Sequence, residues 1–136
     1  MGGAERNLGP IDYGDQRMGW GKGVVAGGFV FLSGVEARLD DDGHAVEGIG
    51  AQTELCLRRV DERLAEAGAT FADAVKLVWY VREAALLGEF FRIRDGWLGE
   101  RYPAFLAERA YASTVVLAQL SFRAVLVEID CTAYTG

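Results

Sequence analysis

Residues 49–81 read IGAQTELCLRRVDERLAEAGATFADAVKLVWYV, and this stretch decides the fold because it holds two different periodicities. From Ile49 to Ala67, apolar positions recur every three or four residues with charged residues between them, which predicts an amphipathic helix. Gly68 then supplies the left-handed backbone that often ends a helix. From Ala74 to Val81 alternate residues are apolar, which predicts a strand. The helix is therefore expected to pack on a sheet.

Two strands are expected before this stretch. The segment KGVVAGGFVFLSG at 22–34 contains two short apolar runs separated by Gly27 and Gly28, the pattern of a two-residue hairpin. The run DDDGH at 40–44 favours a turn that reverses the chain. Residues 1–19, rich in glycine and charge, are expected to form an irregular arm in front of a domain that spans residues 20–136.

One more helix and two strands are expected after the stretch. Large apolar residues at helical spacing predict a helix from about Ala84 to Arg101, and Pro103 is expected to end or follow it. Two closing strands, Ser113 to Leu120 and Ala124 to Thr132, are joined by the short link SFR. The order is β-β-α-β-α-β-β, an α+β domain with two helices on one face of a single sheet.

The second face of this sheet has no helix to cover it. The alternating strands place many apolar residues on that face, and an exposed apolar area beyond a few hundred Å² usually marks an interface. We therefore expect the chain to form an oligomer.

The composition is that of a globular protein and excludes several classes. Of the 136 residues, 51% are hydrophobic and 25% are charged, and the length fits one domain. No apolar run approaches the roughly 20 residues that span a bilayer, and the N-terminus lacks the pattern of a secretory signal. A cytoplasmic protein without membrane contacts is expected. The formal net charge of −6 argues against a nucleic-acid partner, whose phosphates would need Lys and Arg.

The sequence offers few ligands for a metal. His44 is the only histidine, and Cys56 and Cys131 stand far apart in the sequence, so no metal site is expected. Both cysteines lie inside apolar patterns and are interpreted as buried thiols in a reducing compartment. A disulfide or a reactive thiol is the alternative.

Several segments together resemble one family. They are GGFVFLSG at 27–34, AQTELCLRRVDERLAEAG at 51–68, DAVKLVWYV at 73–81, STVVLAQL at 113–120 and VEIDCTA at 127–133. In this order and spacing they are similar to the RidA/YjgF family, over roughly Trp20 to Ala133. The resemblance implies a YjgF/chorismate-mutase-like homotrimer with small-molecule clefts between subunits. It also implies hydrolysis of reactive enamines and imines such as 2-aminoacrylate, without a cofactor.

The resemblance carries over to the site only in part. Ser33 matches a serine of the family's pocket, and Glu128 matches the glutamate that positions the attacking water. Trp20 stands where the family has a tyrosine, and Phe91 stands near a frequent asparagine. The largest departure is Ala112, which occupies the position of the arginine that binds the substrate carboxylate.

The loss of that arginine predicts a changed specificity. An arginine grips a carboxylate through two charge-assisted hydrogen bonds, and an alanine makes neither. Arg109, Arg94 and Arg123 are possible substitutes, of which Arg109 is nearest in sequence; alternatively, Arg109 is a solvent-facing loop residue.

The segment that precedes Ala112 also departs from the family. YPAFLAERAY at 102–111 is about four residues longer than the family pattern, and inserted loops often change specificity. Tyr111 and Thr114 are expected to line the pocket beside Ala112. With Trp20, Phe91 and Trp97 nearby, we expect a bulkier and more apolar ligand, although these aromatic residues alternatively belong to the core.

Glu128 is the expected catalytic residue. Between two apolar neighbours it is a candidate for a raised pKa, which suits a general acid or base, provided that its cleft is dry. The alternative is a side chain that points into solvent. Ser33 has no histidine near it in the sequence and is interpreted as a hydrogen-bonding residue rather than a nucleophile. Glu36 and Arg38 either reach the cleft or form an exposed ion pair.

Three functions remain open. The first is an imine or enamine hydrolase with altered specificity. The second is a cyclase, dehydratase or tautomerase of a biosynthetic pathway, and the third is a non-catalytic binding or chaperone-like protein. Endoribonuclease activity is disfavoured by the acidic charge and the single loop histidine, and a chorismate mutase by Ala112.

Overall fold

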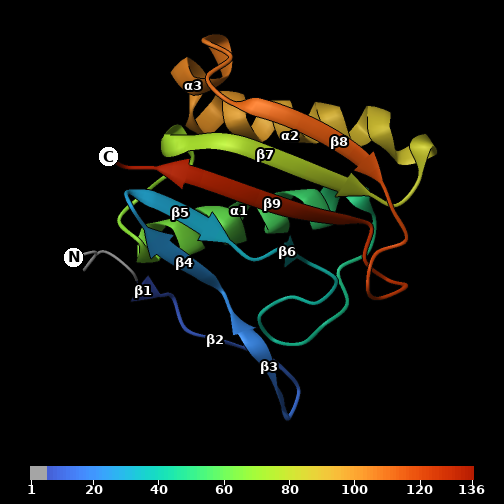
Figure 1. The fold of residues 1–136 in the computed structure, drawn as a ribbon. Helices are drawn as coiled ribbons and strands as arrows, with labels where there is room; N and C mark the ends of the chain where they lie inside the picture. Colours follow the sequence, from blue (N-terminus) through green and yellow to red (C-terminus); the bar gives the residue numbers. More distant parts are fainter. Residues whose placement is uncertain (1–5) are drawn as a thin grey trace.

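The chain forms one main sheet with helices on one side of it. A computed structural model describes residues 6–136, so residues 1–5 of the expected arm lie outside the described part. The main sheet has seven strands in the order β1-β4-β5-β9-β7-β8, with β6 paired to β9. In Figure 1 the two long helices lie behind the sheet and leave its front face open.

The bounds of the elements are as follows. The strands are β1 (Arg6–Asn7), β2 (Pro10–Tyr13), β3 (Gln16–Gly21), β4 (Gly23–Ala26), β5 (Phe29–Leu32), β6 (Val35–Glu36), β7 (Ala74–Val81), β8 (Ala112–Leu117) and β9 (Val127–Tyr134). The helices are α1 (Ile49–Glu66), α2 (Leu87–Arg101) and α3 (Pro103–Ala107), with the short 3-10 turns η1 (Phe71–Asp73) and η2 (Ala84–Leu86).

The predictions for α1 and β7 are confirmed. The strand has the expected bounds, and the helix ends at Glu66, one residue before the expected Ala67. Gly68 has φ +75°, the left-handed conformation expected just past a helix end. The predicted hairpin of β4 and β5 is also present, and Gly27 and Gly28 both have positive φ, as the tight hairpin turn requires.

The closing strands differ from the prediction. β7 pairs with β9 on one side and, in parallel, with β8 on the other, so β8 and β9 are not neighbours. The chain must therefore cross β7, and residues 118–126 form this link in place of the short SFR connection. Arg82 fixes the link, because its Nε donates to the carbonyl oxygen of Val125 and its Nη2 to that of Phe122, both at 2.7 Å.

The expectation of an irregular arm is wrong from Arg6 onward. β1 pairs with β4, and β2 and β3 form a separate two-stranded hairpin that extends below the main sheet (Figure 1). These strands carry glycine and charged residues instead of an alternating apolar pattern, so they could not be predicted as strands. Pro103 also begins a further helix, α3, because proline suits the first turn of a helix.

A buried amide connects α1 to the link in front of β9. The Nε2 of Gln52 donates to the carbonyl oxygens of Val46 and Ala124, and its Oε1 accepts from the backbone N–H of Leu126. Gln52 is only 2% exposed, so these bonds replace water that its amide cannot reach. The start of β9, which carries Glu128, is thereby fixed to the helix layer.

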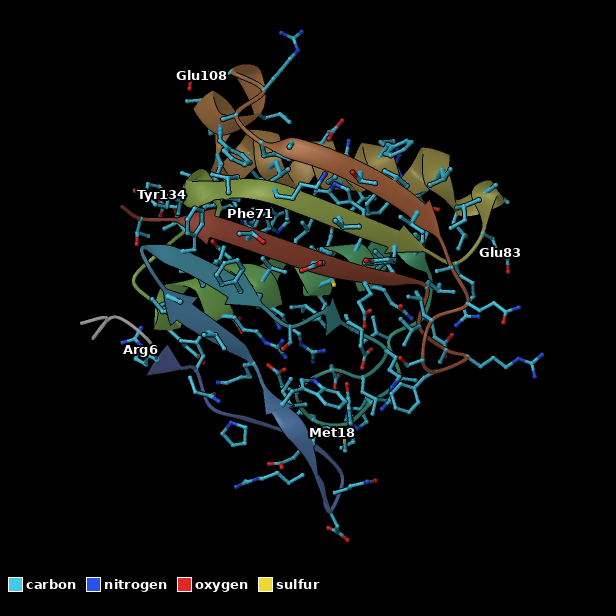
Figure 2. All side chains as sticks on the ribbon, in the orientation of Figure 1. Arg6, Met18, Phe71, Glu83, Glu108 and Tyr134 are labelled. Atoms are coloured by element: carbon cyan, nitrogen blue, oxygen red, sulfur yellow. The ribbon has the colours of Figure 1, made fainter. Side chains whose placement is uncertain are left out.

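The two faces of the sheet differ as predicted. Leu77 and Trp79 of β7 and Ile129 of β9 point into the core beneath the helices and have no exposed surface. The open face is mixed, because β9 presents half-buried polar residues there while the β4–β5 hairpin presents apolar ones (Figure 2). The exposed apolar residues of this face are Val24, Phe29, Phe31 and Tyr134. In the described part of the chain, no helix is both long enough and apolar enough to cross a membrane.

Candidate functional site

Glu128 lies on the open face at the start of β9. In the ladder it faces Glu36 of β6 on one side and Tyr80 of β7 on the other. Its side chain passes over the loop that joins β5 to β6: a β-carbon added to Gly34 would lie 2.9 Å from Cδ and 3.1 Å from Oε2 of Glu128. The absence of a side chain at position 34 is therefore what lets the carboxyl group rest there.

The surroundings of Glu128 favour its protonated form. Burial raises the pKa of Glu128, and the negative charges of Glu36 and Asp130 raise it further. Burial also raises the pKa of Asp130, two residues along the same strand. The raised pKa expected of Glu128 is thus present in a single chain, and the solvent-facing alternative does not hold because the residue is half-buried.

Glu36 and Arg38 form an ion pair that is largely buried rather than exposed. The Nε of Arg38 lies 3.4 Å from Oε1 of Glu36, and the backbone N–H of Arg38 donates to Oε2 at 2.7 Å. The two side chains are only 16% and 21% exposed. The guanidinium of Arg38 also stacks over Phe122, with its Cζ 3.9 Å from the ring centroid.

Tyr13 completes this group from the β2–β3 hairpin. Its ring meets Phe122 edge-on with the centroids 5.5 Å apart. Burial raises the pKa of Tyr13, and the charges of Glu36 and Glu128 raise it further. We call Tyr13, Glu36, Arg38, Phe122 and Glu128 the Glu128 cluster. Tyr13 and Phe122 were not among the predicted site residues, because Tyr13 lies in the segment expected to be an irregular arm and Phe122 in the expected short link SFR.

Ser33 lies at the edge of the cluster and Trp20 lies outside it. The Oγ of Ser33 donates to the carbonyl oxygen of Gly21 at 2.6 Å, so its proton is directed toward β3. Ser33 precedes Gly34 and retains lone pairs that can accept a hydrogen bond. Trp20 is 55% exposed and lines a separate hollow of about 370 Å³ formed by the hairpin and the residues that lead into it.

Phe91 and Tyr111 lie on the helix side of the sheet. Phe91 packs against Phe90 on α2, with ring centroids 5.6 Å apart. Tyr111 stacks on Phe105 of α3 at 5.1 Å and meets Trp79 at 6.1 Å. In one chain these two residues are therefore separated from Glu128 by the sheet itself.

Ala112 and Thr114 lie on the open face but far from Glu128. Ala112 pairs with Lys76 of β7, whereas Glu128 pairs with Tyr80. Four residues along a strand span about 13 Å, and two spacings between neighbouring strands add about 10 Å across the sheet. In one chain the predicted residues of the open face thus form two separate groups, one at Glu128 and the other at Ala112 and Thr114.

Of the cations considered as substitutes for the missing arginine, Arg109 and Arg94 do not join the Glu128 cluster, and Arg123 is an exposed residue of the link next to Phe122. Arg109 is an exposed residue after α3 with φ +52°. Arg94 pairs with Asp95 at 2.9 Å and lies on the helix side beside Phe91. Lys76 was not predicted as a site residue, but it lies directly beside Ala112 in the β7–β8 ladder. Its Nζ donates to Oγ1 of Thr114 at 2.7 Å.

The loop at 40–44 groups three possible metal ligands: Asp40, Asp42 and His44. Oδ1 of Asp40 accepts from the backbone N–H groups of Asp42 and His44, so this grouping is explained by the turn that the sequence predicted. Both cysteines are free and buried, as expected.

Known proteins are similar to this chain in sequence and in fold. The family model described as Endoribonuclease L-PSP matches residues 15–135. A RutC family protein from Pyrococcus abyssi is 27% identical over 116 residues, which are 85% of each chain. The chain has the α+β architecture of this group of proteins, with its helices on one face of the sheet.

Solved structures agree with this assignment. A YjgF family member from Neisseria meningitidis superposes with a TM-score of 0.73 and 27% identity, covering 96% of this chain and 98% of the other. A member of the YjgF/YER057c/UK114 family from Mycobacterium tuberculosis superposes with a TM-score of 0.65 and 29% identity, covering 86% and 87%. The chain belongs to the YjgF/RidA family, whose family model is the one described as Endoribonuclease L-PSP.

Proposed function

We propose that this protein is a cofactor-independent enzyme that hydrolyses the C–N bond of an imine or enamine, with Glu128 as general acid and base. The observation that supports the proposal is the position of Glu128, half-buried over Gly34 and with its pKa raised by burial and by Glu36 and Asp130. A carboxyl group whose pKa is raised in this way is better suited to donate a proton to a substrate and take one back.

The reaction requires one residue that donates a proton to the substrate and later accepts a proton from the attacking water. The protonated carboxyl of Glu128 gives its proton to the imine nitrogen, which makes the carbon electrophilic. Water adds to that carbon, and the proton that it loses returns to the carboxylate of Glu128. The carbinolamine then transfers its hydroxyl proton to nitrogen and breaks the C–N bond. The sum is imine plus water giving a carbonyl compound plus ammonia or an amine, with Glu128 regenerated.

We propose that the second group of residues comes from a neighbouring subunit. Ala112 and Thr114, with Lys76 beside them, are too distant from Glu128 within one chain to share a small ligand with it. A homotrimer that covers the exposed Phe29 and Phe31 would provide a cleft between subunits, where Trp20, Ser33, Phe91, Arg109 and Tyr111 are the remaining candidates for contacts to the ligand.

The proposed ligand is a small molecule and the proposed location is the cytoplasm. The acidic residues around Glu128 would repel the phosphates of RNA, which supports a small substrate rather than a nucleic acid. Two free buried cysteines suit a reducing compartment.

Hydrolysis of imines generated in the assay tests the proposal. The wild-type protein should release ammonia from 2-aminoacrylate or from a bulkier imine, and Glu128→Gln should lower kcat/KM by about 100-fold or more. The matched control is Glu47→Gln, which removes an exposed carboxylate outside the cluster. Turnover that survives Glu128→Gln would contradict the proposal, and so would cleavage of RNA without any turnover of imines.

A second candidate is a cyclase, dehydratase or tautomerase that acts on a bulkier substrate. Ala112 favours it, because this position offers no guanidinium for an α-carboxylate. The expected distinction is a reaction that depends on Glu128 but releases no ammonia. Ligand binding that is unchanged in Glu128→Gln, with no turnover of any substrate, would instead indicate a binding protein.

A further inference from the structure

Two glutamates of the Glu128 cluster are paired across neighbouring strands. Glu36 and Glu128 are partners in the β6–β9 ladder, so their side chains leave neighbouring strands on the same face of the sheet. The negative charge of Glu36 adds to burial in raising the pKa of Glu128, so the two carboxyl groups do not ionise independently. In such a pair, the carboxyl group whose surroundings stabilise a negative charge loses its proton first, and the other carboxyl group keeps its proton to higher pH.

The surroundings of Glu36 favour the charge. One oxygen of its carboxylate lies 3.4 Å from Nε of Arg38, and the other accepts the backbone N–H of Arg38 at 2.7 Å. Stacking on Phe122 holds the Arg38 guanidinium in place. Both carboxylate oxygens of Glu36 therefore have a partner that stabilises the anion.

The groups that face Glu128 come from several elements and are acidic or neutral. Asp130 follows it on the open side of β9, Tyr80 faces it from β7, and Tyr13 approaches from the hairpin. On the helix side of the sheet, α1 carries the buried Cys56 thiol, whose pKa is raised by burial and further by both glutamates.

The nearby cations interact with Glu36 and Cys56 rather than with Glu128. Arg38 pairs with Glu36, and Arg59 donates to the backbone oxygen of Glu36. The positive charges of Arg59 and Arg63, both on α1, lower the pKa of Cys56. Among the residues that the structure describes, the arrangement therefore offers a cationic partner to the Glu36 carboxylate and none to the carboxyl group of Glu128.

We propose that Glu36, held as an anion by Arg38, is a positioning residue that assigns the proton of the pair to Glu128. Glu128 then enters the reaction as the acid. The catalytic part of this inference rests on the proposed function, whereas the proton assignment is measurable without any substrate. Glu36 and Arg38 act through Glu128 and need not touch the ligand.

Carbon NMR of the full chain tests the assignment, with glutamate labelled at the carboxyl carbon and each signal followed against pH. In the wild-type protein, the Glu128 signal should titrate above the ordinary range of a glutamate side chain. Glu36→Gln should move the Glu128 titration to lower pH, whereas Glu36→Asp, which keeps the charge, should leave it near the wild-type position. In Arg38→Met, the Glu128 signal should show two steps, because the proton is then shared between the two carboxyl groups. Glu47→Gln is the control and should change nothing.

The pH dependence of imine hydrolysis gives the second measurement. If Glu128 acts as the acid, activity falls as pH rises through its pKa, and Glu36→Gln should move this fall to lower pH. The lost activity should return when the assay is acidified, which a merely structural defect would not allow. Thermal unfolding identifies any variant that does not fold, and Glu36→Asp then provides the comparison.

The two proposals fail in different ways. An unchanged Glu128 titration in Glu36→Gln overturns the proton assignment, even if imine hydrolysis depends on Glu128. Hydrolysis that does not depend on Glu128 overturns the proposed function, even if the two glutamates titrate as a pair.

Discussion

The carboxyl group of Glu128 rests against the backbone of Gly34, so closely that a β-carbon at position 34 would lie 2.9 Å from Cδ of the glutamate. The close approach involves the end of a flexible side chain and no backbone atom of Glu128. A methyl group at position 34 would therefore move the carboxyl group and leave the fold intact.

Gly34→Ala should accordingly fold normally and lose activity. A displacement of about 1 Å in a catalytic group costs on the order of 100-fold in rate, so kcat/KM for imine hydrolysis should fall by at least about 10-fold. The control is Gly96→Ala on α2, where an added β-carbon meets no atom within 4 Å and activity should be unchanged. Full activity in Gly34→Ala would mean that the position of this carboxyl group is unimportant.

Burial of Asp130 should make stability depend on pH. Its pKa is raised in the folded state from an ordinary value of 3.8, so the folded chain binds this proton more tightly than the unfolded chain. The resulting stabilisation is present below pH 3.8 and is lost as pH rises through the raised pKa. Asp130→Asn should therefore increase the free energy of unfolding at pH 7 and flatten its decline between acid and neutral pH. Urea unfolding at a series of pH values measures this, and a decrease in stability at pH 7 would contradict it.

Loss of the Glu128 carboxyl group should change activity and stability in opposite directions. Glu128→Gln removes a carboxyl group whose pKa is raised above 4.5, so the variant should be more stable than the wild-type protein at neutral pH while losing activity. Thermal unfolding tests the predicted gain in stability, and the imine assay on the same preparation tests the predicted loss of activity. A variant that loses both properties would indicate that Glu128 is structural.

Ser113 should matter for stability through Trp79. The indole Nε1–H donates to Oγ of Ser113 at 2.8 Å, and Trp79 has no exposed surface. Ser113→Ala leaves this donor without its partner and should destabilise the fold by about 1–3 kcal/mol in urea unfolding. Thr114→Ala, which removes an exposed hydrogen bond to Lys76 on the other face, should cost less. Equal costs would mean that the indole finds another acceptor.

The apolar patch on the open face should hold the assembly together. Phe31 is 46% exposed beside Phe29, with ring centroids 5.8 Å apart. Phe31→Glu would place a charge in the proposed interface and should shift the protein from trimer to monomer in sedimentation velocity. Leu39→Glu changes an equally apolar but distant residue and should leave the trimer intact. A wild-type protein that sediments as a monomer would remove the basis for a cleft between subunits.

Elements with strong periodicity were predicted well from the sequence. β7 alternates along its whole length because one face is packed against helices, and α1 presents one continuous buried stripe. Glycine at 27, 28 and 68 marked turns correctly because each needs a positive φ. The hairpin of β2 and β3 lacks such a signal, since its residues pack against no core.

The site was predicted less completely than the fold. Glu128 was identified because it lies in a family segment, and its raised pKa follows first from burial and then from the negative charges of Glu36 and Asp130. Tyr13 and Phe122 reach the cluster from segments far apart in the sequence, and no local pattern indicates such a contact. The sequence leaves open whether Arg38 reaches the cleft or forms an exposed ion pair with Glu36, because burial by a distant aromatic ring cannot be read from its neighbours.

The two native cysteines are placed where chemical reagents do not reach them. The thiol of Cys56 donates to the carbonyl oxygen of Val35, and burial raises the pKa of Cys131 to about 12. Thiolates, which are the reactive species, are therefore scarce at both positions. A cysteine introduced on the surface would be labelled selectively by a maleimide without removing either native sulfur. Spin labels attached in this way would report distances between subunits in solution.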